Sequence, residues 1–328
     1  MRLNALSTIF PHLDHERVHD FRWAFAAGLL SLTALYVGGL IVAALLLAAF
    51  LVPALYLLYL HEAQVYGREP VSVLITTVGG GAVLGLVVSI LIDRAVGVVS
   101  LAPVTGVALL ILLTVLTPLV QEMIKPLPAV VFRRRPMFAE TMDGLTLGVA
   151  AGLGFALAQT LANFSPVFAS LPFQVDPSVW IYPLVSLAVL LPILQGTCTG
   201  AFTAALWVHR RRNDLGVVNS GIPVAVAAHV AFALGGQLLA ERGPGHIAVL
   251  LWQGVVVSVM ILYTRVLLHR ALLDEAAGLG FGEVVCTHCR QEVVAARFCP
   301  QCGMALTASP RRLDGSGGPR LTAPAGGA

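Results

Sequence analysis

The stretch LAPVTGVALLILLTVLTPLVQEMIK, residues 101–125, begins with twenty residues that carry no charge, from Leu101 to Val120. An apolar run of about 20 residues is long enough to cross a bilayer as a helix. The stretch ends on two singular residues, because Glu122 is the only carboxylate within the apolar spans of the chain and Lys125 is its only lysine. The stretch therefore predicts a membrane-spanning helix with an acid and a base at one end.

Two interpretations of this pair stay open on the motif alone. An ionisable side chain at membrane depth costs roughly 2.5–3.5 kcal/mol on insertion scales, so by default it marks a functional site. The structural alternative is an ion pair at the surface, where the helix meets water, between residues three apart on one helix. Pro126 and Pro128 follow directly and predict that the helix ends here.

The composition indicates a polytopic membrane protein. Hydrophobic residues make up 57% and charged residues 11% of the 328 residues, and the mean hydropathy is +0.86, which excludes an ordinary soluble domain. The segment from Met1 to Arg22 is polar, so we expect no cleavable signal peptide. The net charge is only +3 and the arginines flank the apolar spans, so we expect no nucleic acid as a partner.

The apolar segments predict an all-α fold, a polytopic transmembrane helix bundle of about eight spans. The run from Trp23 to Leu60 is nearly twice the length that one span needs, so it must fold back, and Gly38-Gly39 is the best place for the turn. The predicted spans are 23–38, 41–60, 71–92, 101–122, 144–164, 180–208, 219–240 and 246–268.

The distribution of basic residues predicts the orientation of these spans. Cytoplasmic loops of membrane proteins carry an excess of Lys and Arg. Here the basic residues collect before the first span and after the fourth, sixth and eighth: Arg17, Arg22, Lys125, Arg133 to Arg135, Arg210 to Arg212, Arg265 and Arg270. The loops after the first, third, fifth and seventh predicted spans hold only Arg94 and Arg242. We therefore expect an integral protein of a bacterial inner membrane with both termini in the cytoplasm and the lipid bilayer as its surroundings.

Two Cys-x-x-Cys pairs near the C-terminus predict a metal site. Cys286 and Cys289 form the first pair, and Cys299 and Cys302 form the second. This spacing lets four thiolates bind one structural Zn²⁺, and a module of this size has no core of its own without metal. Two disulfides are the alternative, which a reducing cytoplasm disfavours. The module resembles the short zinc ribbons of bacterial membrane proteins, with Arg290 in place of the usual glycine after the first pair.

We expect no metal ligand other than the four cysteines. His288 is expected to be a spectator, and Cys198, which lies within the predicted span 180–208, is expected to be a small buried residue. The chain as a whole then divides into a cytoplasmic segment (1–22), a transmembrane domain (23–273), a zinc ribbon (284–306) and a disordered tail (307–328) rich in Gly, Pro, Ser and Ala.

The predicted fifth span carries a second motif. Asp143-Gly144 is followed by Gly148, Gly152, Gly154-Phe155 and Gln159. Glycines at intervals of four residues lie on one face and allow close helix approach. A buried amide such as that of Gln159 needs a hydrogen-bond partner at mid-membrane depth.

Together the two motifs resemble the PrsW family of glutamic-type intramembrane proteases, which is distantly similar to the CAAX-prenyl proteases. That family has Glu-Glu-x-x-Lys, then Asp-Gly followed by Gly-x-Gly-Phe-x-x-x-Glu, and a His on a third helix. The resemblance covers roughly residues 45 to 235, with a proline-bearing helix at Pro53 and a Glu69-Pro70 loop as further landmarks. It implies a site formed by Glu122, Lys125 and His229.

The chain departs from the family pattern at three acid or base positions. Gln121 and Gln159 stand where the family has Glu, and Gln195 stands in the segment where the family carries His. An amide keeps the length and hydrogen-bonding capacity of Glu but does not exchange a proton near neutral pH. Glu122, Lys125 and His229 remain as an acid–base group, although a lone intramembrane His is as often a hydrogen-bonded structural residue.

Two functions from different classes follow. One is an intramembrane peptidase that cleaves transmembrane proteins, with catalysis weakened or lost. The other is a pseudoprotease that binds a transmembrane partner without cutting it and uses the zinc ribbon for docking in the cytoplasm. A small-molecule transporter is disfavoured because the sequence has no internal repeat.

Overall fold

The structure is a computed structural model. It describes residues 15–63, 69–101, 106–170, 177–211, 218–243, 245–278, 283–286, 288–294, 299, 301–302, 304 and 306. The predicted disordered tail, 307–328, and most of the predicted N-terminal segment 1–22 lie outside the described residues.

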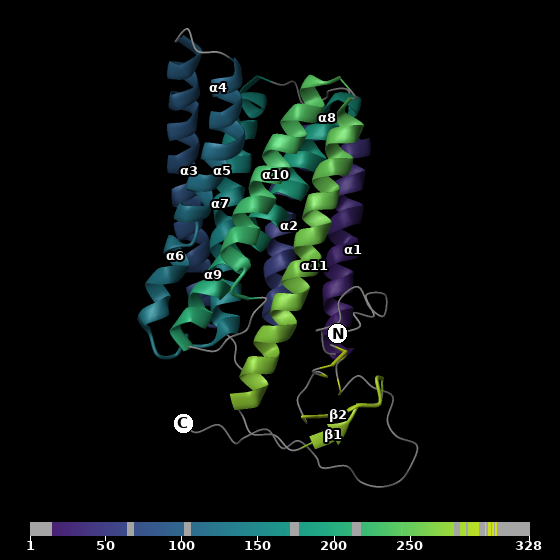
Figure 1. The fold of residues 1–328 in the computed structure, drawn as a ribbon. Coiled ribbons are helices and arrows are strands. Elements are labelled where there is room, and N and C mark those ends of the chain that lie inside the picture. The colour runs from purple at the N-terminus through teal and green to yellow at the C-terminus, as the bar shows by residue number, and fades with distance from the viewer. Residues whose placement is uncertain are drawn as a thin grey trace.

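The described elements are helical up to the C-terminal hairpin (Figure 1). The α-helices are α1 (His15–Val37), α2 (Ile41–Ala63), α3 (Val71–Leu101), α4 (Gly106–Ile111), α5 (Thr117–Ile124), α6 (Leu127–Val130), α7 (Thr141–Ser170), α8 (Pro177–Pro183), α9 (Leu191–Arg211), α10 (Gly221–Glu241) and α11 (His246–Gly278). Two π-helical segments, η1 (Leu112–Leu116) and η3 (Leu184–Leu190), and one 3₁₀ segment, η2 (Val131–Arg134), join neighbouring helices. Strands β1 (Glu283–Val285) and β2 (Glu292–Val294) pair antiparallel.

The predicted all-α polytopic bundle is confirmed. Seven helical segments of the described chain are long and apolar enough to cross a membrane, and Phe21–Val37 in α1 is a shorter apolar helix beside them. One candidate span runs from Leu109 to Arg134, so it extends well beyond the predicted end at 122. The Glu122–Lys125 pair therefore lies within this candidate span.

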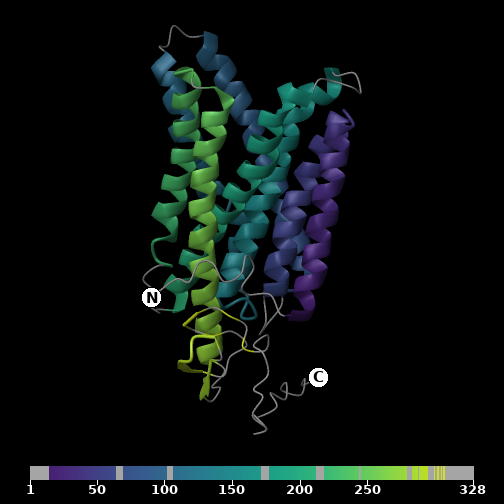
Figure 2. The same cartoon turned by 90° about the vertical axis from the view of Figure 1, so that its right-hand side faces the viewer.

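Helix α7 is the central rod of the bundle, with α9 and α3 packed against it (Figure 2). Its glycines allow this approach, as the sequence predicted. A Cβ added at Gly144 would lie 2.7 Å from the Trp207 ring, and one at Gly152 would lie 2.5 Å from the backbone oxygen of Gln195. On the other side, Gly81 of α3 lies directly against the backbone oxygen of Ala151.

Helix α5 ends in a turn that keeps the chain close to the bundle. Its last residue is Ile124, and the backbone N–H of Lys125 donates to the oxygen of Gln121. Pro126 lies in the turn, as predicted, but Pro128 lies in the first turn of α6, where a missing N–H is tolerated. The prolines therefore end α5 and start a second short helix.

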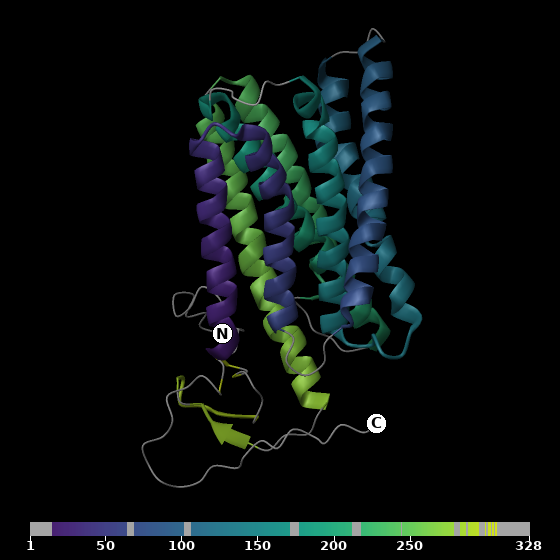
Figure 3. The ribbon, with the colours of Figure 1, turned by 180° about the vertical axis from the view of Figure 1, so that it is seen from behind.

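Helices α1 and α2 form a hairpin at one side of the bundle (Figure 3). The turn between them falls at Gly38-Gly39, as predicted, and Gly39 has a φ of +73°, which suits glycine. The main packing partner of α1 is α2, whereas α2 also packs on α7, α9 and η3. Among the described helices, α1 thus has α2 as its one main packing partner.

Candidate functional site

The centre of the candidate site is the carboxylate of Glu122 on α5. Its Oε1 atom accepts a hydrogen bond from Lys125 Nζ and lies 2.6 Å from Nδ1 of His229 on α10. The side chains of Glu122 and Lys125 are both fully buried, and that of His229 is 5% exposed. The structure therefore brings these three predicted residues together, and the ion pair that the structural alternative placed at the surface is buried in the bundle.

The ammonium of Lys125 is enclosed by the protein. Because residues three apart share a helix face, the last turn of α5 directs Glu122 and Lys125 to the same side. Lys125 Nζ also lies 6.0 Å from the ring centroid of Phe155 on α7, at the outer limit of a cation–π contact. The carboxylate of Glu122 and the ammonium of Lys125 are therefore buried as a pair.

A second group consists of two amides on α7 and α9. Gln195 Nε2 donates a hydrogen bond to Gln159 Oε1, and Gln195 is fully buried. The close approach of the two helices at Gly152 brings the amides within reach of each other. The sequence analysis required a hydrogen-bond partner for the Gln159 amide. That partner is Gln195, which is itself one of the three positions that depart from the family pattern.

The two groups are neighbours within the bundle. Phe155, which contacts Lys125, lies one helical turn before Gln159 on α7. Helix α9, which carries Gln195, packs on α10, which carries His229, and also contacts α5, which carries Glu122. Gln121 is 2% exposed on α5, but among the described residues it forms no side-chain hydrogen bond to either group. Of the six predicted residues, five therefore form two hydrogen-bonded sets, and Gln121 lies beside one of them.

Each set contains one buried acceptor that the described part of the chain leaves unpaired. These atoms are Oε2 of Glu122 and Oε1 of Gln195. A buried acceptor without a donor costs roughly 1–3 kcal/mol. Each of these atoms is therefore ready to accept an N–H or O–H from water or from a bound molecule.

The membrane site does not fit a metal ion. Its ordinary metal-ligand side chains are Glu122 and His229, and the Oε1 atom of Glu122 already faces the ammonium of Lys125. Within the described ranges, the only group of three or more His, Cys, Asp or Glu side chains that could hold a metal is the set of four cysteines near the C-terminus. The membrane site offers proton chemistry from one carboxylate, one imidazole and one ammonium.

Sequence reasoning missed two features of this region. Phe155 was quoted only as part of a motif, although it contacts Lys125. Gln253 on α11 is 6% exposed and accepts a hydrogen bond of 2.8 Å from Ser186. The signal for Gln253 was present, because it is the only Asn or Gln in the predicted span 246–268.

The four cysteines near the C-terminus are arranged as the zinc prediction requires. The Sγ atoms of Cys286, Cys289, Cys299 and Cys302 all lie within 4.8 Å of one another. The N–H of Gln301 donates to Cys299 Sγ at 3.4 Å, as backbone groups do around metal-bound thiolates. His288 is not part of this set, and its predicted role as a spectator stays a prediction.

The turn after the first cysteine pair has the geometry that usually selects glycine. Arg290 has a φ of +58°, and its N–H donates to the oxygen of Cys286 at 2.8 Å. A non-glycine residue in this region is strained. Arg290 replaces the usual glycine at a position where the backbone adopts a left-handed conformation.

The thiols of this set differ in acidity in the metal-free chain. Burial raises the pKa of Cys302 to about 11, and burial also raises the pKa of Cys299. For Cys286, burial is outweighed by hydrogen bonds from the backbone N–H groups of Cys289 and His288, so its pKa lies below the ordinary value. Metal binding would therefore displace protons from Cys299 and Cys302.

Comparison with known proteins identifies the transmembrane part. The model of a family described as PrsW family intramembrane metalloprotease matches residues 69–267. The match contains all six predicted membrane-site residues, and it leaves out α1, α2 and the cysteine set. It starts later than the predicted resemblance, so the Pro53 landmark lies outside it, and it continues into α11. No curated protein and no solved structure matched the chain.

Proposed function

The chain belongs to the PrsW family of intramembrane proteases, and from this premise we propose that it acts on transmembrane segments of other proteins with weakened or lost proteolysis. The observation that carries this proposal is the pairing of Gln159 with Gln195. Two amides that satisfy each other occupy positions where the family resemblance implies a carboxylic acid and an imidazole. Such a pair keeps the site packed but supplies neither an acid nor a base.

The residual chemistry would depend on Glu122. Its Oε1 is fixed by Lys125 and His229, and its Oε2 is a buried acceptor able to hold the hydrogen of a water molecule. In a peptidase step Glu122 would accept the water proton as the water oxygen bonds to the peptide carbonyl carbon. His229 would take this proton from Glu122 and pass it to the nitrogen of the departing amine, so that the C–N bond breaks to a neutral amine and a carboxylic acid and both side chains return to their starting states.

The charge of Lys125 sets a limit to this chemistry. A paired ammonium stabilises the carboxylate, which weakens Glu122 as a base. The same ammonium would stabilise negative charge that develops on the peptide oxygen. The balance between these two effects decides between slow cleavage and none.

A cleavage assay in reconstituted bilayers tests the proposal. We expect Glu122→Gln to abolish whatever cleavage of a labelled transmembrane substrate the unmodified protein shows. The combination of Gln159→Glu with Gln195→His should raise the cleavage rate, because it returns an acid and a base to the amide pair. Equal rates for the Glu122→Gln variant and its parent would refute the role of Glu122.

The second candidate function is a pseudoprotease that binds a transmembrane partner without cutting it. The mutual satisfaction of the Gln159 and Gln195 amides favours it, because this pair needs no proton to stay stable. Turnover of a transmembrane substrate by the unmodified protein would eliminate this alternative. Binding without turnover, retained in Glu122→Gln, would support it.

The cytoplasmic and metal assignments extend the same proposal. We propose that the four cysteines hold one structural zinc ion in a ribbon at 284–306 that serves as a docking module, outside the transmembrane domain at 23–273. The ion would join the two cysteine pairs and leave no open position for catalysis. The start of α1 and the end of α11 lie at the same end of the bundle (Figure 1), which supports both ends of the transmembrane domain lying on one side of the membrane, and the distribution of basic residues makes the cytoplasm of a bacterial inner membrane the proposed side.

A further inference from the structure

A cavity of about 280 Å³ lies between the α1–α2 hairpin and the helices α9 and α11. The family match begins at residue 69, after the whole hairpin, so one wall of the cavity is outside the matched part. Phe25 on α1 and Ile261 on α11 line the cavity and are 45% and 46% exposed. Both belong to apolar helices of the bundle, so the cavity opens sideways toward the acyl chains of the bilayer.

The charged end of this cavity lies on α11. Thr264 and Arg265 line it, and Arg265 is the only charged side chain among the described residues that do. Arg265 stands seven residues before Leu272, the end of the candidate span, which is about 10 Å at a rise of 1.5 Å per residue. A long basic side chain at this depth reaches the headgroup layer while its stem stays in apolar surroundings. The cavity therefore combines an apolar interior with one cation near the membrane surface.

The hydroxyl of Thr264 is a second polar group in the cavity wall. Thr264 is 5% exposed, and its Oγ1 has no partner of hydrogen-bond geometry in the described chain, although the hydroxyl of Tyr56 lies nearby. A buried hydroxyl without such a partner costs free energy. A ligand that brings an acceptor oxygen to this place would remove that cost.

These features match an anionic phospholipid. Its acyl chains suit an apolar cavity that opens to the bilayer, and its phosphate oxygens pair with a guanidinium through two parallel N–H···O bonds. A guanidinium has five N–H donors, so contacts of Arg265 within the protein leave donors for a phosphate. Basic pockets between membrane-spanning helices bind anionic headgroups in this way. A zwitterionic lipid would bring its own cation to the same place and gain less from Arg265.

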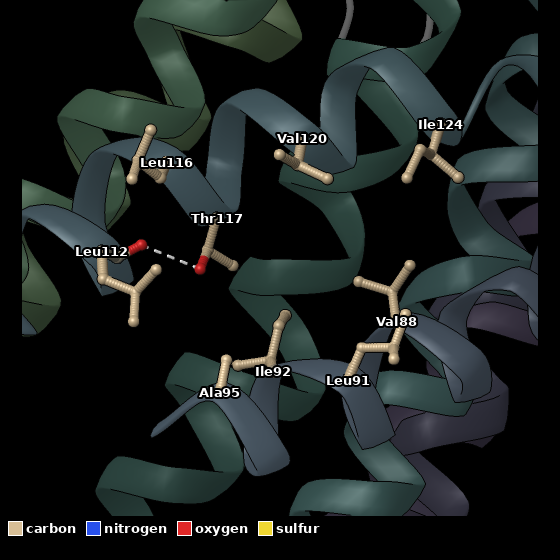
Figure 4. Close-up of a pocket in the computed structure, with 9 residues that line it drawn as sticks. All are labelled: Val88, Leu91, Ile92, Ala95, Leu112, Leu116, Thr117, Val120 and Ile124. Atoms are coloured by element: carbon tan, nitrogen blue, oxygen red, sulfur yellow. Dashed lines mark hydrogen bonds between the residues drawn. The ribbon is translucent and has the colours of Figure 1, made fainter. Parts of the chain in front are cut away.

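The groove between α3 and α5 provides the contrast. Figure 4 shows it, with Leu91 of α3 opposite Val120 of α5. Its volume is about 190 Å³, and its one polar side chain, Thr117, is bonded to the oxygen of Leu112 at 2.9 Å. None of the described residues that line it is charged. Lipid chains can lie in this groove, but its lining offers nothing that selects a headgroup.

We propose that the cavity between the α1–α2 hairpin and α11 binds one anionic phospholipid of the leaflet on the side where α11 ends. One acyl chain would lie between Phe25 and Ile261, and the phosphate would accept N–H groups of Arg265. The hydroxyl of Thr264 would donate to an ester oxygen of the same lipid. The bound lipid would join the hairpin to α11. This site does not depend on proteolysis, so it stands or falls apart from the proposed function.

Photo-crosslinking in nanodiscs of defined composition tests this site. Benzoylphenylalanine would replace Phe25 in the full chain, and Val120, in the groove between α3 and α5, is the matched control position. The nanodiscs would hold equal amounts of phosphatidylglycerol, which is anionic, and phosphatidylcholine, which is zwitterionic, with the same acyl chains. Mass spectrometry of the adducts gives the ratio of the two lipids at each position. Because the acyl chains are identical, a difference in this ratio reports on the headgroup.

We expect several-fold more phosphatidylglycerol than phosphatidylcholine adduct at position 25 and near-equal adducts at position 120. Arg265→Gln should bring the ratio at 25 to that at 120, whereas Arg265→Lys, which keeps the charge, should retain part of the enrichment. Arg134→Gln removes an exposed charge outside the cavity and should leave the ratio unchanged.

Three results would overturn the proposal. They are equal adducts of the two lipids at position 25, the same enrichment at 120 as at 25, and enrichment at 25 that survives Arg265→Gln. The comparison of positions 25 and 120 needs no change at Arg265, so it decides the proposal even if that variant does not fold.

Discussion

At the scale of single residues, the membrane site is a buried charge balance. Glu122, Lys125 and His229 come from two helices, and their polar atoms meet at one oxygen, Glu122 Oε1. Coulomb attraction in such an enclosed place is strong, but desolvation of both ions offsets much of it. Glu122 and Lys125 therefore stabilise the fold only when both are present. Replacing one of them should lower the free energy of unfolding more than replacing both.

This reasoning predicts the effect of Lys125→Met on stability. The change leaves the Glu122 carboxylate buried without its cation, which should lower the free energy of unfolding by about 3–5 kcal/mol. The double variant Glu122→Gln/Lys125→Met should recover most of this loss. Denaturant titration in detergent micelles measures both effects.

The control for this experiment is Arg134→Met. Arg134 is exposed at the end of η2, and an exposed charge contributes little to stability. A double variant as unstable as Lys125→Met alone would contradict the interpretation of the two residues as a compensating pair.

At the scale of helices, close approach to α7 determines where the site residues lie. Helix α3 touches α7 through backbone at Gly81, and α9 does so at Gly152. These contacts leave no room for a side chain, so each glycine fixes a helix position and, for α9, the position of Gln195. The glycines of α7 therefore allow close helix packing and, through it, set the position of Gln195 relative to Gln159.

Two glycines of α3 offer a direct test. A Cβ at Gly81 would collide with the backbone oxygen of Ala151, so Gly81→Ala should lower the free energy of unfolding by about 1–3 kcal/mol. Gly79 has nothing within 4 Å of its added Cβ, so Gly79→Ala should leave stability unchanged or raise it by up to about 1 kcal/mol. Thermal unfolding in one detergent compares the two. Equal effects would show that α3 does not approach α7 this closely.

At the scale of the whole molecule, the sequence predicted the helices more accurately than it predicted the contacts between them. Apolar length predicts a span because the bilayer thickness is fixed, and seven long spans plus the shorter α1 agree with the eight predicted rods. Boundaries were less accurate, because Asp93 and Arg94 continue α3 to Leu101 although they are charged. The π-helical segments η1 and η3 depend on packing and have no signal in apolar length.

The candidate site was predictable only in part. Glu122 stood out as a lone carboxylate, but its contact with His229 joins residues 107 positions apart, and only the family resemblance suggested it. The bond between Gln159 and Gln195 was not predicted, because spacing along one chain does not fix which faces of two helices meet. The cysteine set needed no such information, since four ligands within 17 residues have few ways to be arranged.

The cysteine module and the membrane bundle should respond separately to metal loss. Cys286, Val293 and Cys299 form a small buried cluster, to which Leu306 adds, apart from the clusters within the bundle. Because so small a cluster supplies little folding energy, metal binding should supply most of it.

We expect the purified full chain to contain one equivalent of zinc, and Cys289→Ser to remove it without changing the thermal unfolding of the bundle. Cys198→Ser, which alters the cysteine buried in α9, is the matched control and should retain the zinc. Metal analysis measures the zinc content, and circular dichroism at helical wavelengths follows the unfolding of the bundle. Zinc retained in Cys289→Ser, or a bundle that loses stability when the zinc is lost, would contradict this separation.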